Sequence, residues 1–158
     1  RGHAEGPLPP SEEAVNLVHA LEQAGDPRCA VQLVERLTTE RPDYAPAWAR
    51  RSQLALARGD IVAALEFSAL ACRKDANCGF SRLNHGIALR AAGRVTSATG
   101  QLSTALSLRP DDPVILSHYG LCLADQFQHT LALDALDRAI EMAPGDAMHG
   151  SNRLMTGQ

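Results

Sequence analysis

The sequence predicts an all-α fold, a solenoid in which antiparallel helix pairs follow one another along the chain. Two observations lead to this prediction. Written in rows of 34 residues that start at Ser11, Ala45, Gly79 and Pro113, the chain aligns with itself without gaps. Within each row, apolar residues recur at intervals of three and four, which is the spacing of one face of a helix. A fixed period of this size is the sequence signature of a stacked-repeat architecture.

The first half of each row is predicted to form a helix that ends at a glycine. In the first row Val15, Val18 and Leu21 share one helix face. The repeat position that follows this helix is occupied by glycine in three rows, which suits a helix end where the backbone needs a left-handed residue. This column holds Gly25, Gly59 and Gly93, with Phe127 in the fourth row.

The second half of each row is predicted to form the partner helix. Asp26 and Asp60 follow the glycine in the first two rows and are suited to cap this helix, and Pro27 suits its first position. Two columns of small residues indicate close contact between helix axes: Ala30, Ala64, Ala98 and Ala132, then Leu37, Ala71, Ala105 and Ala139. A late proline ends the helix in three rows, at Pro42, Pro110 and Pro144, with Ala76 in the second row.

These columns divide the chain into a leader, four units and a tail. Residues 1–10 are polar and rich in proline and glycine, which predicts a flexible leader rather than a signal peptide. The four units are residues 11–44, 45–78, 79–112 and 113–146. Residues 147–158 are predicted to be a partial capping helix or the start of a further unit.

The pattern resembles the tetratricopeptide repeat (TPR) family over about residues 11–146. That family has a small residue at repeat position 8, as at Gly86 and Gly120, besides the glycine, alanine and proline columns given above. Trp48 matches the family's aromatic at position 4, where the other units have Ala14, Arg82 and Leu116. Phe127 and Gln128 replace the glycine-led turn of the fourth unit. The resemblance implies a right-handed superhelix of antiparallel helix pairs.

The resemblance also implies that the first helix of each unit lines a concave, peptide-binding groove. The candidate groove residues at the family's positions are Val15, His19, Ala49, Arg50, Gln53, Leu56, Phe80, Leu83, Asn84, Ile87, Arg90, Val114, Ser117, His118 and Leu121. They combine an apolar stripe with polar edges, and an exposed apolar patch usually marks an interaction site. We expect a protein or peptide partner with an apolar or amphipathic segment, held in register by Arg50, Asn84, Arg90 and His118. The alternative is that neighbouring helices cover several of these side chains.

One ligand class of the family is disfavoured. Its carboxylate clamp holds the C-termini of heat-shock chaperones with lysine, asparagine and arginine at set positions. The matching residues here are Val15, His19, Arg50, Phe80 and Asn84, so the clamp is absent.

The predicted function is therefore that of a non-catalytic adaptor, scaffold or chaperone-like module. One alternative is the substrate-recruiting arm of a larger enzyme, such as a glycosyltransferase, sulfotransferase or hydroxylase. Another is a self-assembling factor in bacterial secretion, pilus or envelope machinery. Because residues 147–158 would cover only part of Leu133, Leu136 and Ile140, we expect either a longer natural chain or a homo-oligomer formed through this end.

No catalytic residue, metal site or cofactor is predicted. The six histidines are scattered, and the glycines occur singly at turns rather than in a phosphate-binding loop. His118 and Cys122 are four residues apart, which would permit shared metal ligation with His85 nearby, but ordinary packing is favoured. The four cysteines have no CxxC spacing and are interpreted as free thiols, with Cys72 and Cys78 as the one pair to test for a disulfide.

Charge and hydropathy exclude two classes of partner. The net charge is −3 without a basic stripe, which disfavours nucleic acid. No apolar run approaches the roughly 18 residues that a membrane span requires. The thiols favour the cytoplasm, with the bacterial periplasm as the alternative if a signal segment has been removed.

Overall fold

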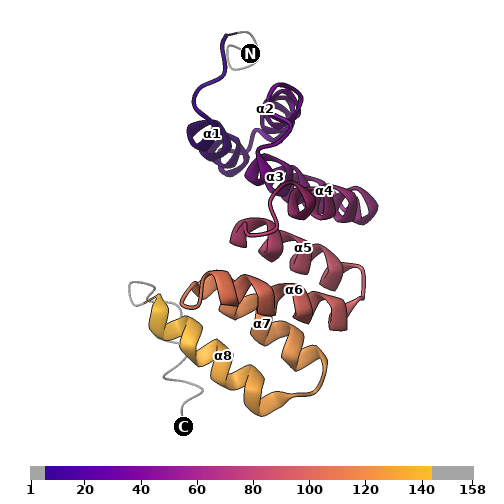
Figure 1. Ribbon diagram of the computed structural model, residues 1–158, viewed down its shortest axis with the longest axis vertical. Helices are drawn as coiled ribbons and strands as arrows, with labels where there is room; N and C mark the ends of the chain where they lie inside the picture. Colours follow the sequence, from indigo (N-terminus) through magenta and orange to yellow (C-terminus); the bar gives the residue numbers. More distant parts are fainter. Residues whose placement is uncertain (1–5, 144–158) are drawn as a thin grey trace.

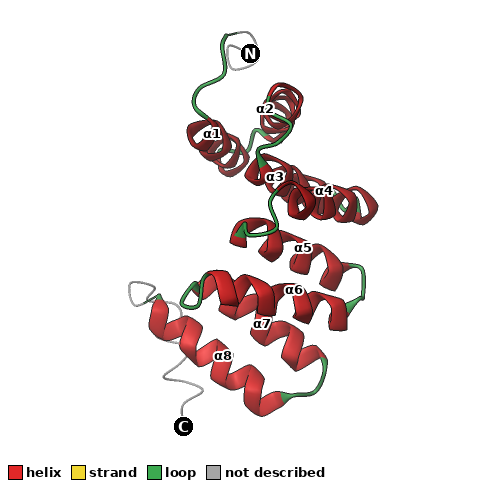
Figure 2. Cartoon of the chain, viewed as in Figure 1, coloured by secondary structure: helices red, strands yellow, loops and turns green. Residues whose placement is uncertain are grey.

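The computed structural model describes residues 6–143, which form helices and loops without a strand (Figures 1 and 2). The helices are α1 (Ser11–Gln23), α2 (Pro27–Glu40), α3 (Ala45–Ala57), α4 (Ile61–Lys74), α5 (Gly79–Ala91), α6 (Val95–Leu108), α7 (Pro113–Asp125) and α8 (His129–Met142). The predicted all-α class is confirmed. Part of the leader (1–5), Pro144 and the predicted capping segment (147–158) lie outside the described residues.

The helices pair in chain order and the pairs follow one another along the long axis of the molecule (Figure 1). Each odd-numbered helix packs against the even-numbered helix that follows it, and α3, α5 and α7 also pack against the preceding pair. Each odd-numbered helix begins at the first residue of a 34-residue row. The solenoid predicted from the period is confirmed.

The turn inside each pair has one backbone geometry. Gly25, Gly59 and Gly93 have φ angles of 81°, 82° and 82°, as their column predicts. Phe127 takes the same left-handed conformation, with φ of 61°. The amide of the following residue, Gln128, donates to the Leu123 carbonyl at 2.9 Å, in the same way that Asp26 donates to Leu21. The fourth turn therefore keeps the shape of the other three without glycine.

The predicted caps are confirmed. Asp26 accepts a hydrogen bond from the Cys29 amide and Asp60 accepts one from the Ala63 amide, both at 3.1 Å. These bonds satisfy amides that have no partner within the helix. Asp112 caps α7 in the same way, accepting from the amides of Val114 and Ile115.

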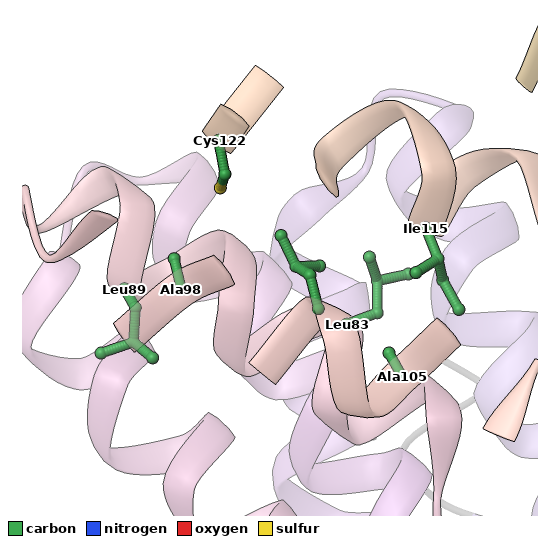
Figure 3. Close-up of a cluster of buried hydrophobic side chains, with 7 residues drawn as sticks. Leu83, Leu89, Ala98, Ala105, Ile115 and Cys122 are labelled. Atoms are coloured by element: carbon green, nitrogen blue, oxygen red, sulfur yellow. The ribbon is translucent and has the colours of Figure 1, made fainter. Parts of the chain in front are cut away.

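The core lies between the two helices of each pair and between successive pairs (Figure 3). Its largest cluster joins α5, α6 and α7 and consists of Leu83, Leu89, Ala98, Leu102, Ala105, Ile115 and Cys122. Glycine permits the close approach of α5 and α6, since a Cβ on Gly86 would lie 2.7 Å from Leu102 Cγ. Gly120 meets Leu136 in the same way one unit later, at 2.8 Å.

Arg82 shows how a unit replaces the family's aromatic residue. Trp48 Nε1 donates to the Pro42 carbonyl at 2.8 Å, which anchors the loop before α3. One unit later, Arg82 Nε donates to the Ala76 carbonyl at 3.1 Å, the equivalent loop atom. The guanidinium therefore keeps the loop contact although the aromatic ring is absent.

No helix in residues 6–143 is both long enough and apolar enough to cross a bilayer.

Candidate functional site

The predicted groove residues separate into buried and accessible groups. Four are buried, with exposed fractions of 6% for Val15, 0% for Ala49, 6% for Leu83 and 2% for Asn84. Leu83 belongs to the cluster of Figure 3, and the Asn84 side chain donates to the Phe80 carbonyl at 2.8 Å. These four residues are part of the core, so for them the alternative holds: neighbouring helices cover their side chains.

The remaining eleven residues reach the surface to different extents. His19, Val114 and Leu121 are exposed. Those that are half-buried are Arg50, Gln53, Leu56, Phe80, Ile87, Arg90, Ser117 and His118. Leu56 and Ile87 pack against core clusters, so the apolar stripe is weak at its centre and is most accessible on α7.

Arg50 brings together residues of three units. Its Nη1 lies 3.2 Å from His19 Nδ1 of α1 and donates to Gln53 Oε1 of α3. Its guanidinium carbon stands 4.9 Å from the centroid of the Phe80 ring of α5, within cation–π range. The structure therefore gathers three predicted groove residues, His19, Gln53 and Phe80, around a fourth, Arg50.

The same guanidinium has an unused donor. Arg50 Nε is buried and makes no hydrogen bond among the described residues. Burial lowers the pKa of Arg50, while the nearby Glu22 carboxylate opposes this effect. Because buried polar atoms are rarely left without a partner, a shift of the Arg50 side chain that brings this N–H to an acceptor would be favoured.

Arg50 and Phe80 line a hollow of about 350 Å³, called the inner hollow below. Its full lining is Glu12, Val15, Asn16, Tyr44, Pro46, Arg50, Cys78, Phe80 and Arg109. Burial raises the pKa of Tyr44, so its hydroxyl is a neutral hydrogen-bond donor at pH 7.

Sequence reasoning missed part of this lining. Tyr44, Cys78 and Arg109 lie in the loops between units, whereas the family's groove positions are confined to the first helices. Glu12 and Pro46 could have been found, because they share the repeat column of Phe80 and Val114.

The groove differs at its other end, between α5 and α7. Arg90 is engaged there, since its Nε donates to Asp125 Oδ2 at 2.6 Å and its Nη2 to Oδ1 at 3.3 Å. This bond raises the pKa of Arg90 and lowers that of Asp125. Burial, followed by the charge of Arg90, lowers the pKa of His118, which favours the neutral imidazole. Arg90 thus forms an ion pair between two units, whereas Arg50 has an Nε–H without a hydrogen-bond acceptor in the described part of the chain.

The described residues include no group of three or more histidine, cysteine, aspartate or glutamate side chains placed to hold a metal ion. His85 lies 3.0 Å from the Ser68 hydroxyl through its Nδ1. All four cysteines are free thiols. Burial raises the pKa of Cys72 to about 11, which keeps this thiol protonated and unreactive at neutral pH.

Comparisons with known proteins agree with this architecture. The tetratricopeptide repeat family model matches residues 15–77 and 83–147. A TPR protein of Thermus thermophilus has a crystal structure similar to this chain, with a TM-score of 0.80 and 21% identity over 92% of this chain and 80% of that one. No curated protein sequence matched the chain.

Structures of MamA are also similar. One MamA crystal structure gives a TM-score of 0.67 at 15% identity, covering 88% of this chain and 81% of that one. MamA from Desulfovibrio magneticus gives 0.67 at 18% identity, covering 86% and 77%. At these identities the likeness concerns the fold.

Proposed function

The chain belongs to the tetratricopeptide repeat family, and from this premise we propose that it is a non-catalytic module that binds a peptide segment of another protein on its concave side. The observation that carries the proposal is the inner hollow, where a partly buried guanidinium with a free Nε–H stands against an aromatic ring. Such a site combines a directed donor with an apolar surface, which is how peptide segments are commonly held.

The chemistry of the hollow defines the segment. A backbone carbonyl or a carboxylate of the ligand accepts from the Arg50 guanidinium, and an adjacent apolar side chain packs against Phe80. The Tyr44 hydroxyl supplies a second donor at the rim. Beyond the hollow, Val114 and Leu121 of α7 are 52% and 38% exposed and extend the apolar contact along the groove.

The test is a peptide selection followed by affinity measurement. Peptides selected from a display library on the full chain are titrated by fluorescence anisotropy against Phe80→Asp and Arg50→Gln variants. We expect each substitution to weaken binding about tenfold or more, the typical effect of losing a charge-assisted hydrogen bond or an apolar anchor. Leu83→Asp is unsuitable because Leu83 is core.

Val62→Asp is the matched control. Val62 is 67% exposed on α4 and lines neither the inner hollow nor the groove, so the same change of charge there leaves affinity unchanged. Circular dichroism verifies that all variants are folded. Selected peptides that bind wild type and Phe80→Asp equally well would refute the proposal.

A second candidate function is self-association, which the surface of α8 favours. Leu131, Leu133 and Met142 are 55%, 59% and 40% exposed, a concentration of apolar surface at one end of the described solenoid. Sedimentation of wild type against a Leu131→Asp, Leu133→Asp double variant tests it. A concentration-dependent dimer that the double variant loses supports this function, and a monomer at all concentrations rejects it.

A further inference from the structure

A second, larger cleft lies where the first unit meets the second. This junction cleft has a volume of about 860 Å³ and shares no lining residue with the inner hollow. Its apolar wall comes from Pro27 and Val31 of α2 and from Leu54 and Ala57 of α3. Three charged residues, Glu22, Arg28 and Arg58, complete it.

The repeat register shows that these charges are unusual. Two rows later in the alignment, Arg28 and Arg58 correspond to Thr96 and Gln126. At that later junction Gln126 Nε2 donates to Thr96 Oγ1 at 3.4 Å, so the two positions face each other directly across the interface. At the first junction the same two positions hold a pair of arginines.

The later junction is closed by a further bond that the first one lacks. There Arg90 of α5 pairs with Asp125 of α7. The corresponding residues at the first junction are Glu22 and Ala57, so α3 offers no carboxylate to the cleft. Glu22 lies 3.9 Å from His19 and acts electrostatically on Arg50, both predicted groove residues.

Arg28 and Arg58 therefore have no ion-pair partner among the described residues, although Glu22 also lines the cleft. Both are exposed, and neither makes a side-chain hydrogen bond or an ion pair within residues 6–143. Two guanidinium groups placed across one cleft repel each other, and a carboxylate between them would turn this repulsion into two charge-assisted hydrogen bonds.

We propose that the junction cleft is a second binding site, for a peptide segment of a partner protein in which a carboxylate lies next to a large apolar side chain. The carboxylate is held between Arg28 and Arg58, and the apolar side chain enters the recess formed by Val31 and Leu54. The site goes beyond the proposed concave function because no residue of the inner hollow takes part.

The probe is a short fluorescein-labelled peptide, Ser-Gly-Glu-Leu-Phe-Glu-Gly-Ser, titrated against the full chain by anisotropy. Two companion peptides replace either both glutamates with glutamine or the Leu-Phe pair with Ala-Ala. We expect both companions to bind at least about tenfold more weakly, because each lacks one half of the recognition chemistry.

Single substitutions assign the binding to the cleft. Arg28→Gln and Arg58→Gln are each expected to weaken binding about tenfold. Arg94→Gln removes the same charge from an exposed arginine that also lacks an ion pair but lines a different junction, and it leaves the affinity unchanged. Phe80→Asp also leaves it unchanged, so failure of the concave proposal and failure of this one are distinguishable.

Arg58→Glu provides a test by stability as well as by binding. It places a carboxylate opposite Arg28 and gives the first junction an ion pair, so the melting temperature rises while peptide binding is lost. The proposal is overturned if no saturable binding occurs, if Arg94→Gln weakens binding as much as Arg58→Gln, or if a single-stranded oligonucleotide binds in preference to the peptide.

Discussion

The closest contacts between helices occur at glycines, where a side chain is missing. Gly86 and Gly120 occupy the same repeat column, and each faces a leucine of the partner helix, Leu102 or Leu136. In the first unit the equivalent column holds Val18, which shares a core cluster with Val34. A larger leucine on one helix is therefore matched by a glycine on the other, as close packing requires.

We expect Gly86→Ala to destabilise the protein by about 1–2 kcal/mol. The new Cβ would overlap the fully buried Leu102 side chain, and the cost of overpacking exceeds the helix propensity gained. Gly100→Ala is the matched control, since nothing lies within 4 Å of its added Cβ and it should stabilise α6 by about 1 kcal/mol. Urea unfolding measures both, and equal effects of the two substitutions would contradict the packing argument.

Phe127 is strained, and Phe127→Gly should stabilise the protein by about 1 kcal/mol. A left-handed residue with a Cβ costs roughly 1–2 kcal/mol, and part of this gain is lost to the backbone entropy of glycine. The ring contributes little burial because Phe127 is 81% exposed. Phe127→Ala separates the two effects: it removes the ring, keeps the Cβ, and should leave the urea midpoint nearly unchanged. A midpoint raised equally by alanine would refute the strain.

Two histidines make stability depend on pH. Burial lowers the pKa of His85 and His118, and the charges of Arg82 and Arg90 add to this. Since the unfolded chain binds these protons more readily, the free energy of unfolding should fall as pH drops below the unfolded pKa of about 6.5. Urea unfolding between about pH 7.5 and 5 measures this slope. A His85→Gln, His118→Gln variant should have a flatter profile, and an unchanged slope would count against the prediction.

The buried groove residues show that repeat position alone does not determine whether a side chain is accessible. Ala49 and Leu83 occupy one column with Val15 and Ser117, yet only Ser117 remains partly exposed. The first helix of each unit packs against its own partner and against a neighbouring unit. Small changes in helix spacing therefore decide whether a side chain at this repeat position is buried. Tyr44 was missed for another reason, because contacts made by loops have no helical period.

The even-numbered helices differ in how their N-termini are capped. Aspartate caps α2 and α4, as predicted for the first two rows, but α6 is preceded by Arg94, which makes no side-chain cap bond. An arginine at this end also meets the positive pole of the helix. The residue after the turn glycine therefore caps the second helix in some units and not in others, although the backbone hydrogen bonds of the turns are alike.

Arg94→Asp should therefore stabilise the protein by about 1 kcal/mol, through a new cap bond and a better interaction with the helix dipole. The expected bond is the one that Asp60 makes to the Ala63 amide. Asp60→Ala is the reverse experiment and should cost about the same. Thermal unfolding compares both with wild type, and a gain from Arg94→Ala equal to that from Arg94→Asp would assign the effect to charge removal alone.

Charge is unevenly distributed along the chain: the first and fourth units are acidic and the second and third are basic, which the net charge of −3 does not reveal. Counting lysine and arginine against aspartate and glutamate, the four units carry −4, +2, +2 and −4. Ion pairs join units of opposite sign, as in Lys74 with Asp43 and Arg138 with Asp111. Each exposed pair contributes little on its own, roughly 0–1 kcal/mol, so the junctions depend mainly on apolar contact.

Stability should therefore vary along the solenoid with the quality of the junctions. A unit of a repeat array is stabilised by its contacts with its neighbours, and the interface between α1–α2 and the following unit contains the 860 Å³ junction cleft. Amide exchange in α1 and α2 should be at least about tenfold faster than in α5 and α6, which corresponds to 1.4 kcal/mol of local opening. Hydrogen–deuterium exchange read by mass spectrometry gives this comparison. Arg58→Glu, which pairs with Arg28 across the cleft, should slow exchange in α2 and leave α8 unaffected. Equal protection of all eight described helices would instead mean that the array opens as one cooperative unit.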